Sequence, residues 1–226
     1  MRPPQWAVVA PIEVEELTKT IKDMNPESAT DPDNISVCLI RVMPRLLLAA
    51  LLNLWLFVGK IPAPLKHTRT VLIPKFPGAA QPQQHRPITI APAVVRCYTQ
   101  LMAKRTASLC SLHPAQRAFT EVDGTAENIT LLAALMRDAQ QKLQPMAVAW
   151  LDMAKAFDSV SHHSIKRAAR RAGLPPPAVR VVEDLYQDAT TKIRRDIRIH
   201  TTRGVRQGDS WSPWLFNAVV DEVVVA

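Results

Sequence analysis

The sequence predicts an α/β fold, mostly helical and with short antiparallel strands. Apolar residues recur at helical spacing in several segments, of which residues 11–24 are one example. The apolar run Met146–Leu151 ends at Asp152 and has the character of a buried strand. β-Branched residues alternate along Thr191–Thr201, a pattern typical of a strand or a hairpin. Helical and strand patterns that follow one another in this way indicate the α/β class.

Composition bounds the kinds of partner that the chain can have. Its 226 residues are enough for one large domain or two small ones, and 47% of them are hydrophobic, so a sizeable core can form. The net charge is +8 and the pI is about 9.8. This balance favours a polyanionic partner, nucleic acid first and an anionic membrane surface second. A basic protein with a solvated Lys and Arg face explains the charge equally well.

Cysteine usage and hydropathy point to a reducing intracellular compartment. The cysteines Cys38, Cys97 and Cys110 are odd in number and have no Cys-x-x-Cys spacing, so neither a zinc site nor a disulfide framework is expected. The most apolar run, Leu46–Val58, is interrupted by Asn53 and is shorter than the roughly 20 residues that a membrane span needs. We interpret this run as a core helix.

The first third of the chain is expected to be helical. A helix is predicted over Pro11–Met24, with acidic residues in its first turn. Ala29–Ser36 is rich in turn residues, and Asn34 within it tolerates the left-handed conformation better than most residues other than glycine. The core helix is predicted over Pro44–Val58, with Gly59 as its C-terminal cap.

A hairpin with cations at its ends is expected next. Its strands are predicted at Thr68–Ile73 and Ile88–Ile90. The loop between them, Pro74–Pro87, is too rich in proline for regular structure, and a loop of this length is usually functional or disordered. Pro92–Cys110 then predicts a basic amphipathic helix. Its charges either form a solvated face or contact phosphates.

Helices and a second hairpin follow. Thr191–Thr201 supplies the expected strand or hairpin and carries several cations. The last helix is still running at Ala226, which favours a fragment or a truncated gene product. Further helices are expected at about Ala126–Leu143, from a cap at Ser159 or Ser161 through Ala172, from Pro175–Pro177 through about Asp188, and from Pro213 onward.

Four segments resemble motifs of one enzyme family. Ala147–Val160, with Asp-Met-Ala-Lys-Ala-Phe-Asp at its centre, resembles the first catalytic motif of reverse transcriptases in its non-LTR (LINE-like) retrotransposon version. Thr202–Asn217, which contains Arg-Gln-Gly-Asp, is similar to the next motif. Arg69–Lys75 and Arg86–Ile90 are similar to the fingers motifs of the same enzymes. Together they cover most of the chain in the family's order.

The resemblance implies a right-hand polymerase from a retrotransposon of the site-specific, ribosomal-DNA-inserting type. Residues 1–145 would be the fingers with an N-terminal extension, and residues 146–226 a partial palm. The intact enzyme would be an RNA-directed DNA polymerase, with an RNA template, a DNA primer and deoxynucleoside triphosphates as partners. No membrane is involved, and the location is intracellular, nuclear in a eukaryotic host. The resemblance does not give the oligomeric state.

The first motif implies the catalytic metal ligands. Nucleotide transfer uses two divalent ions, here Mg²⁺, held by carboxylates and substrate phosphates. Asp152 is the expected catalytic carboxylate and metal ligand, helped by the carbonyl of Met153, and Phe157 would lie under the sugar of the incoming nucleotide. Taken alone, Asp152 would be interpreted as a cap of the next turn. The ordered set of motifs favours the catalytic role.

The remaining motifs imply nucleotide-binding residues. Arg69, Lys75 and Arg86 occupy the positions of the family's fingers cations, which grip the triphosphate. Arginine is a bidentate phosphate partner and lysine a point charge, so both types suit the task. Gln207 and Gly208 match the loop that approaches the nascent base pair, where glycine permits close backbone contact. Each cation taken singly is an ordinary surface charge.

Two departures from the family pattern stand out. Tryptophans at positions 211 and 214 replace smaller family residues, so they either pack in the core or damage the nucleotide pocket. The chain contains no Asp-Asp pair of the kind that the third palm motif carries, and Asp221-Glu222 lies on the last helix. One carboxylate cannot hold two ions, so we predict that this chain alone does not polymerise.

Two alternatives remain open. In the first, the chain is a non-catalytic nucleic-acid-binding remnant instead of part of an enzyme. In the second, it is a reverse transcriptase of the intron-encoded or retron type instead of the retrotransposon type. Two less specific features are given structural interpretations. His162-His163 are interpreted as first-turn helix residues. Asp158 either supports the metal site or caps a helix, and the cap is favoured.

Overall fold

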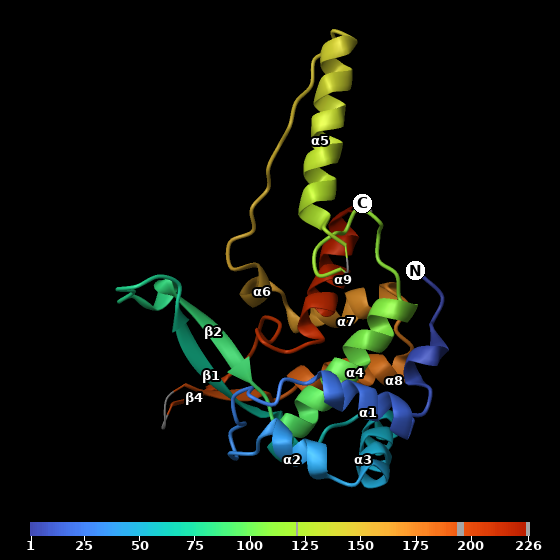
Figure 1. Cartoon of the computed structure of the whole chain (residues 1–226), viewed down its shortest axis with the longest axis vertical. Coiled ribbons are helices and arrows are strands. Elements are labelled where there is room, and N and C mark those ends of the chain that lie inside the picture. Colours follow the sequence, from blue (N-terminus) through green and yellow to red (C-terminus); the bar gives the residue numbers. More distant parts are fainter. Residues whose placement is uncertain (121, 194–196, 225–226) are drawn as a thin grey trace.

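The computed structural model describes residues 1–120, 122–193 and 197–224. Helices and a small mixed sheet build a body from which one long helix projects (Figure 1). This arrangement confirms a mixed helix and sheet fold. Short 3-10 turns occur at Trp6–Val9, Ala63–Lys66 and Pro82–Gln84.

The two predicted N-terminal helices are present as α1 (Val14–Asp23) and α3 (Arg45–Val58). A short helix that the sequence analysis did not predict, α2 (Val37–Val42), lies between them in the chain. Helix α3 ends at Gly59, whose φ of +73° confirms the predicted left-handed cap. The predicted left-handed turn residue Asn34 has a φ of +61°.

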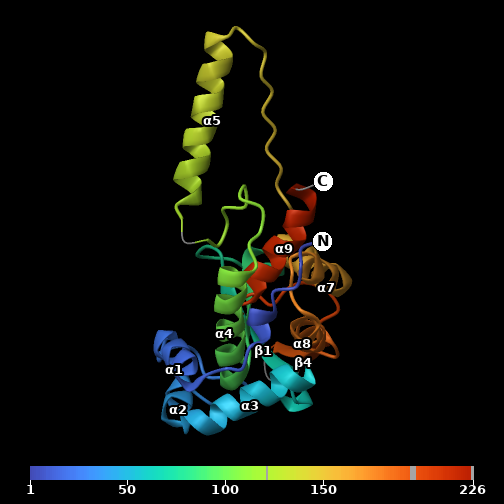
Figure 2. The same cartoon turned by 90° about the vertical axis from the view of Figure 1, so that its right-hand side faces the viewer.

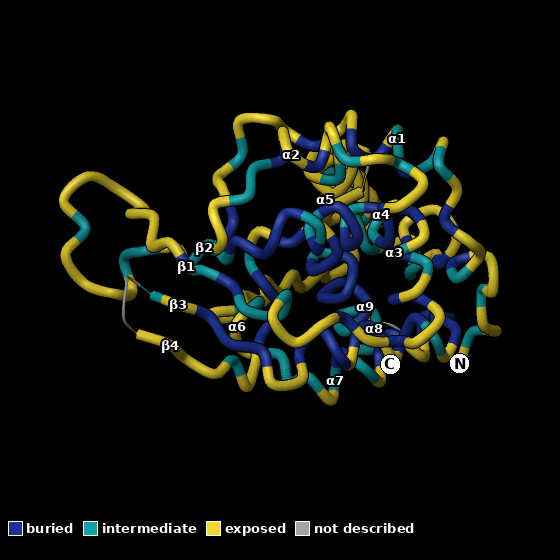
Figure 3. The backbone as a smooth tube through the Cα atoms, turned by 90° about the horizontal axis from the view of Figure 1, so that it is seen from below, coloured by how far each residue is buried: buried dark blue, intermediate teal, exposed yellow. Residues whose placement is uncertain are grey.

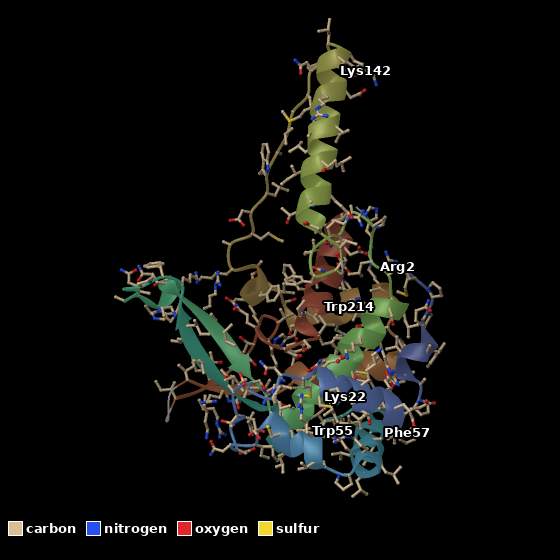
Figure 4. All side chains as sticks on the ribbon, viewed as in Figure 1. Arg2, Lys22, Trp55, Phe57, Lys142 and Trp214 are labelled. Atoms are coloured by element: carbon tan, nitrogen blue, oxygen red, sulfur yellow. The ribbon has the colours of Figure 1, made fainter. Side chains whose placement is uncertain are left out.

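Helix α4 (Ala93–Leu109) is the centre of the body. It buries one side against α1 and α2 and is also in contact with the last helix, α9. Tyr98 packs edge-on against Trp55 of α3, which Figure 4 labels, with ring centroids 5.7 Å apart. Arg105 is largely buried, and its guanidinium is held by both carboxylate oxygens of Glu16 at 2.7 and 2.6 Å. The predicted basic helix is therefore mostly a core element.

The sheet brings distant segments together. Its strands are β1 (His67–Pro74), β2 (His85–Ile90), β3 (Thr190–Ile193) and β4 (Ile197–His200), in the order β2-β1-β3-β4. The two hairpin pairings are antiparallel, as predicted, but β1 pairs with β3 in parallel. The loop between β1 and β2 is shorter than expected, because β2 begins at His85.

Four helices complete the body. They are α6 (Ala156–Ser159), α7 (His162–Arg171), α8 (Pro176–Tyr186) and α9 (Ser212–Val224). Ser161 caps α7, because its hydroxyl accepts a hydrogen bond from the amide of Ser164 at 3.0 Å. Trp211 is fully buried just before α9, and its indole nitrogen donates to the Thr106 hydroxyl at 3.2 Å. Trp214, labelled in Figure 4, is also buried, so both tryptophans serve packing.

The predicted buried strand before Asp152 is wrong. Met146–Leu151 is not a buried strand but an exposed coil that returns along α5 (Gly124–Gln141), and the two form a projecting arm (Figures 1 and 2). Trp150 is 78% exposed and Leu151 94% exposed. An apolar run becomes a buried strand only when a neighbouring strand accepts its hydrogen bonds, and none of the described strands pairs with it. Lys142 marks the far end of the arm in Figure 4.

Within the part of the chain that the structure describes, none of the helices combines the length and apolarity that a membrane span requires.

Candidate active site

The loop over residues 203–209 joins two of the motifs that the sequence singled out. The amide of Gly204 donates to the carbonyl of Val160 at 2.7 Å, and that of Val205 donates to the carbonyl of Phe157 at 2.9 Å. On the other side, the amide of Thr89 on β2 donates to the carbonyl of Gln207 at 2.7 Å. The loop therefore fastens the α6 turn to the free edge of the β1–β2 hairpin.

Two glycines make this close approach possible. Gly208 has a φ of +102°, and a Cβ atom placed on it would lie 3.0 Å from the carbonyl oxygen of Thr89. Gly204 has a φ of +85°, and its Cβ would lie 3.0 Å from the Cα of Asp158. L-residues rarely adopt such angles, and the atoms that a Cβ would meet first are backbone. A side chain at either position would therefore be strained and would force the neighbouring backbone to move.

Gln207 and Asp158 are paired. The Gln207 amide nitrogen donates to a carboxylate oxygen of Asp158 at 2.8 Å. The expectation that Asp158 caps a helix is wrong, because Ser161 caps α7. The carboxylate of Asp158 instead fixes the direction in which the Gln207 amide points. This pairing was missed because the two residues are far apart in sequence.

Phe157 belongs to an aromatic cluster. Its ring centroid lies 4.8 Å from that of Phe216 on α9 and 5.9 Å from that of Phe119. The ring is half-buried, so one part packs on the body and the rest remains accessible. Such packing holds the ring in one orientation beside Gln207 and its loop.

Buried polar groups support the loop from below. The Arg206 guanidinium donates to the carbonyl of Leu185 and lies 5.8 Å from the ring centre of Tyr186. Burial raises the pKa of Tyr186 to about 12. His162 packs on the same ring, with centroids 4.8 Å apart, and burial lowers its pKa. Both histidine positions, 162 and 163, lie in the first turn of α7, as expected.

One face of the sheet carries several threonines and lies next to this loop. Strand register places Thr68, Thr70, Thr89 and Thr191 on one face. The hydroxyls of Thr70 and Thr191 are 2.7 Å apart. These threonines, with Gln207 and neighbouring loop residues, line a small cavity of about 180 Å³.

The three predicted fingers cations lie elsewhere on the hairpin. Register places Arg69 and Arg86 together on the face opposite the threonines. Arg69 donates to the carbonyl of Thr30 at 2.9 Å, while Arg86 is exposed. Lys75 follows the end of β1, and its ammonium donates to the carbonyl of Gln83 at 2.9 Å.

A buried aspartate that the sequence analysis did not single out holds the turn next to Arg69. Asp31 is 2% exposed, and its carboxylate accepts from the amides of Asp33 at 2.9 Å and Ile35 at 2.8 Å. Its second oxygen accepts from the amide of Ala93 at 3.0 Å, which caps α4. The turn sequence Asp-Pro-Asp-Asn could have pointed to this role of Asp31, but the sequence analysis inferred only the turn from it.

Asp152 and Met153 do not lie at the end of a described strand, as predicted for them, and are not grouped with the other predicted site residues. Both are exposed in the coil of the arm. Among residues 1–120, 122–193 and 197–224, no group of three or more His, Cys, Asp or Glu side chains is placed to hold a metal ion. The structure thus gathers Phe157, Gln207 and Gly208, and leaves the predicted metal ligands outside that group.

Comparison with known proteins gives one family. The family model for reverse transcriptase (RNA-dependent DNA polymerase) matches residues 73–225. The chain is 38% identical over 221 residues to a Pol polyprotein of the type-1 retrotransposable element R2 from Popillia japonica, covering 95% of this chain and 30% of the relative. It is 40% identical over 179 residues to an R2 Pol polyprotein from Nasonia vitripennis, covering 77% of this chain and 18% of the relative.

A third relative gives the same result. The Pol polyprotein of the type-2 retrotransposable element R2DM from Drosophila melanogaster is 35% identical over 201 residues, which cover 87% of this chain and 19% of the relative. The chain spans less than a third of the length of these relatives. The family match begins at residue 73, near the end of β1, and runs into α9, so it includes β2, the loop and the aromatic cluster described above. The chain therefore belongs to the reverse transcriptase (RNA-dependent DNA polymerase) family.

Proposed function

We propose that this chain forms the fingers and the first part of the palm of a right-hand polymerase that copies RNA into DNA. Residues 1–145 form the fingers with an N-terminal extension, and residues 146–226 form the partial palm. The partners are an RNA template, a DNA primer and deoxynucleoside triphosphates, and the location is intracellular, nuclear in a eukaryotic host. The observation that carries the proposal is the loop over residues 203–209, which joins the α6 turn to β2.

In this proposal the loop and Phe157 form the floor of a nucleotide site. The Phe157 ring, held by Phe216, supports the sugar of the incoming nucleotide and disfavours a 2′-hydroxyl. Gln207, oriented by Asp158, and Gly208 approach the nascent base pair. Because Gly208 carries no side chain, backbone and substrate can come close together there.

The fingers cations hold the triphosphate in this proposal. A Cβ on Gly208 would lie 3.2 Å from a methyl group of Ile88, and Ile88 shares its face of β2 with Arg86. A nucleotide bound at this edge of β2 would therefore lie close to Arg86. Arg69 and Lys75 supply further positive charge along β1, with guanidinium and ammonium groups that suit phosphate oxygens.

The described residues do not complete a Mg²⁺ site. Asp152 and the carbonyl of Met153 are the proposed ligands, but Asp152 is exposed on the arm and no second carboxylate joins it in a metal-binding group within the described residues. A two-ion centre requires several oxygen ligands around each ion. We therefore expect the chain by itself to show no Mg²⁺-dependent primer extension. Robust extension that is lost in Asp152→Ala would contradict this expectation.

Nucleotide binding provides the direct test. We expect the chain to bind a fluorescent deoxynucleoside triphosphate, and Lys75→Gln and Arg86→Gln each to weaken that binding severalfold by removing a phosphate contact. Arg170→Gln on α7, an exposed arginine without an ion pair in the described residues, is the matched control. Equal nucleotide affinity in all three variants and the unmodified chain would refute the assignment of the fingers cations.

A non-catalytic nucleic-acid-binding remnant is the second candidate, and the net charge of +8 favours it. Binding of RNA without any binding of nucleotide would select it. The relatives described above are retrotransposable-element proteins, which favours that lineage over an intron-encoded or retron type.

A further inference from the structure

Cationic side chains from three neighbouring strands lie in one row across the sheet. The register pairs Arg69 of β1 with Lys192 of β3, and Lys192 with Arg198 of β4. Directly paired residues point to the same face, and adjacent strands are about 4.8 Å apart. These three residues, the basic row, therefore cross one face from β1 to the outer edge of the sheet.

No ion pair neutralises the basic row within the described residues. None of its three members pairs with a carboxylate there. The sequence has no Asp or Glu anywhere from Asn34 to Thr120, a stretch that contains the whole β1–β2 hairpin. Lys192 and Arg198 are exposed, and Figure 3 shows β4 as an exposed outer strand. Neighbouring like charges repel, so a bound polyanion would stabilise the row.

A cleft adjoins the inner end of the basic row. It has a volume of about 750 Å³ and is lined by Arg69 and Lys192 on one side and by Ala79 and Pro82 of the hairpin loop on another. The guanidinium of Arg69 is anchored to the carbonyl of Thr30, while its Nε atom is buried without a hydrogen-bond partner in the described residues. The cleft therefore offers one fixed cation and one exposed cation at its wall.

Apolar surface lies beside these cations. Val71 follows Arg69 on the same face of β1, is 37% exposed and also lines the cleft. Sites for single-stranded nucleic acid combine cations that follow the phosphates with aromatic side chains on which bases stack. Val71 is aliphatic and offers apolar contact without stacking, so the cations carry the inference.

We propose that the basic row binds the phosphate backbone of a single nucleic-acid strand, which under the proposed function is the RNA template. The inference rests on that function and adds Lys192 and Arg198 to the residues that contact substrate. A row spread over three strands covers roughly 10 Å between its ends. Successive phosphates of one extended strand can contact cations spread over this distance. A single nucleotide bound at the β2 edge is less suited to the row, because β1 lies between β2 and the strand that carries Lys192.

Salt-dependent binding tests the row. The whole chain is titrated into a labelled single-stranded RNA of about 20 nucleotides, with fluorescence anisotropy as readout, between about 50 and 200 mM salt. The double variant Lys192→Gln/Arg198→Gln is expected to weaken binding and to lower the slope of log affinity against log salt by about 0.7 per lost contact, or about 1.4 in all. Lys192→Arg keeps the charge and is expected to keep the slope.

The controls separate this inference from the proposed function. Arg170→Gln removes one exposed charge from α7 and is expected to leave affinity and slope unchanged. Both replaced side chains of the double variant are exposed, so its melting curve should match that of the unmodified chain. If the unmodified chain binds RNA and the double variant keeps the full slope, the row is refuted while the nucleotide site stands.

The remaining outcomes are equally decisive. Failure of the double variant to bind nucleotide, with RNA binding unchanged, would assign the row to a triphosphate and overturn the inference. Absence of RNA binding by the unmodified chain at about 50 mM salt would overturn the inference together with the proposed template contact.

Discussion

Replacing Gly208 with alanine measures how tightly the loop over residues 203–209 is held against β2. Alanine at a positive φ costs about 1–2 kcal/mol. The new Cβ would also lie 3.0 Å from the backbone oxygen of Thr89, so the loop or the strand has to shift. That shift endangers the hydrogen bond between Thr89 and Gln207, which is 2.7 Å long and contributes about 1 kcal/mol. The free energy of unfolding should fall by about 2–3 kcal/mol in all.

Gly78 provides the matched control. It has a φ of +84°, but a Cβ on it would meet no atom within 4 Å. Gly78→Ala therefore reports the cost of the backbone angle alone, and the excess cost of Gly208→Ala reports the contact with β2. Each kcal/mol corresponds to about 2–4 °C in Tm for a chain of this size.

The assay is urea denaturation followed by circular dichroism, repeated as a thermal melt. We expect Gly208→Ala to melt clearly below Gly78→Ala. Equal losses in the two variants would refute the view that the loop is pressed against the strand, because strain in φ would then account for the whole effect.

Three further predictions concern buried polar groups. Asp31→Ala should lower the free energy of unfolding, measured by urea denaturation, by about 2 kcal/mol. Two turn amides and the first amide of α4 lose their hydrogen-bond acceptor in this variant. A loss below about 0.5 kcal/mol would contradict the prediction. Arg105→Lys should lower the free energy of unfolding by about 2–4 kcal/mol in the same assay. A single ammonium group cannot replace the guanidinium, which donates to one carboxylate and three carbonyls. An unchanged free energy of unfolding would contradict this prediction. Burial raises the pKa of Asp209, so the native state holds its proton more strongly than the unfolded chain. Stability from this group is fully present below about pH 4, the unfolded value, and is lost as the pH rises toward the folded value. Asp209→Asn should therefore gain stability relative to the parent chain as the pH rises above about 4, and a difference that does not depend on pH would contradict the shift.

Local patterns predicted the helices well. Helical periodicity located α1, α3 and α4, and glycine after the last apolar residue of α3 gave its end. Such features depend on residues a few positions apart, so they are visible in the sequence. The β1–β2 hairpin and the β3–β4 hairpin were found for the same reason.

Long-range pairing was not predictable from one sequence. Parallel pairing of β1 with β3 joins residues more than a hundred positions apart, and no local pattern encodes that choice. The hydrogen bond between Gln207 and Asp158 is of the same kind. The basic row also follows from register alone, because Lys192 and Arg69 look like unrelated surface cations in the sequence.

The apolar run Met146–Leu151 shows why hydrophobicity alone does not specify a strand. Its composition favours burial, yet Trp150 and Leu151 are among the most exposed apolar side chains of the described residues. Burial requires a partner that covers the side chains and accepts the backbone hydrogen bonds, and the described sheet ends at β2 and β4 without reaching the arm. By contrast, Phe157, a few residues later, is fixed by contacts with Phe216 and by the loop over residues 203–209. The floor of the proposed nucleotide site is therefore held by the body of the molecule, while the proposed metal ligand Asp152 depends on where the arm packs.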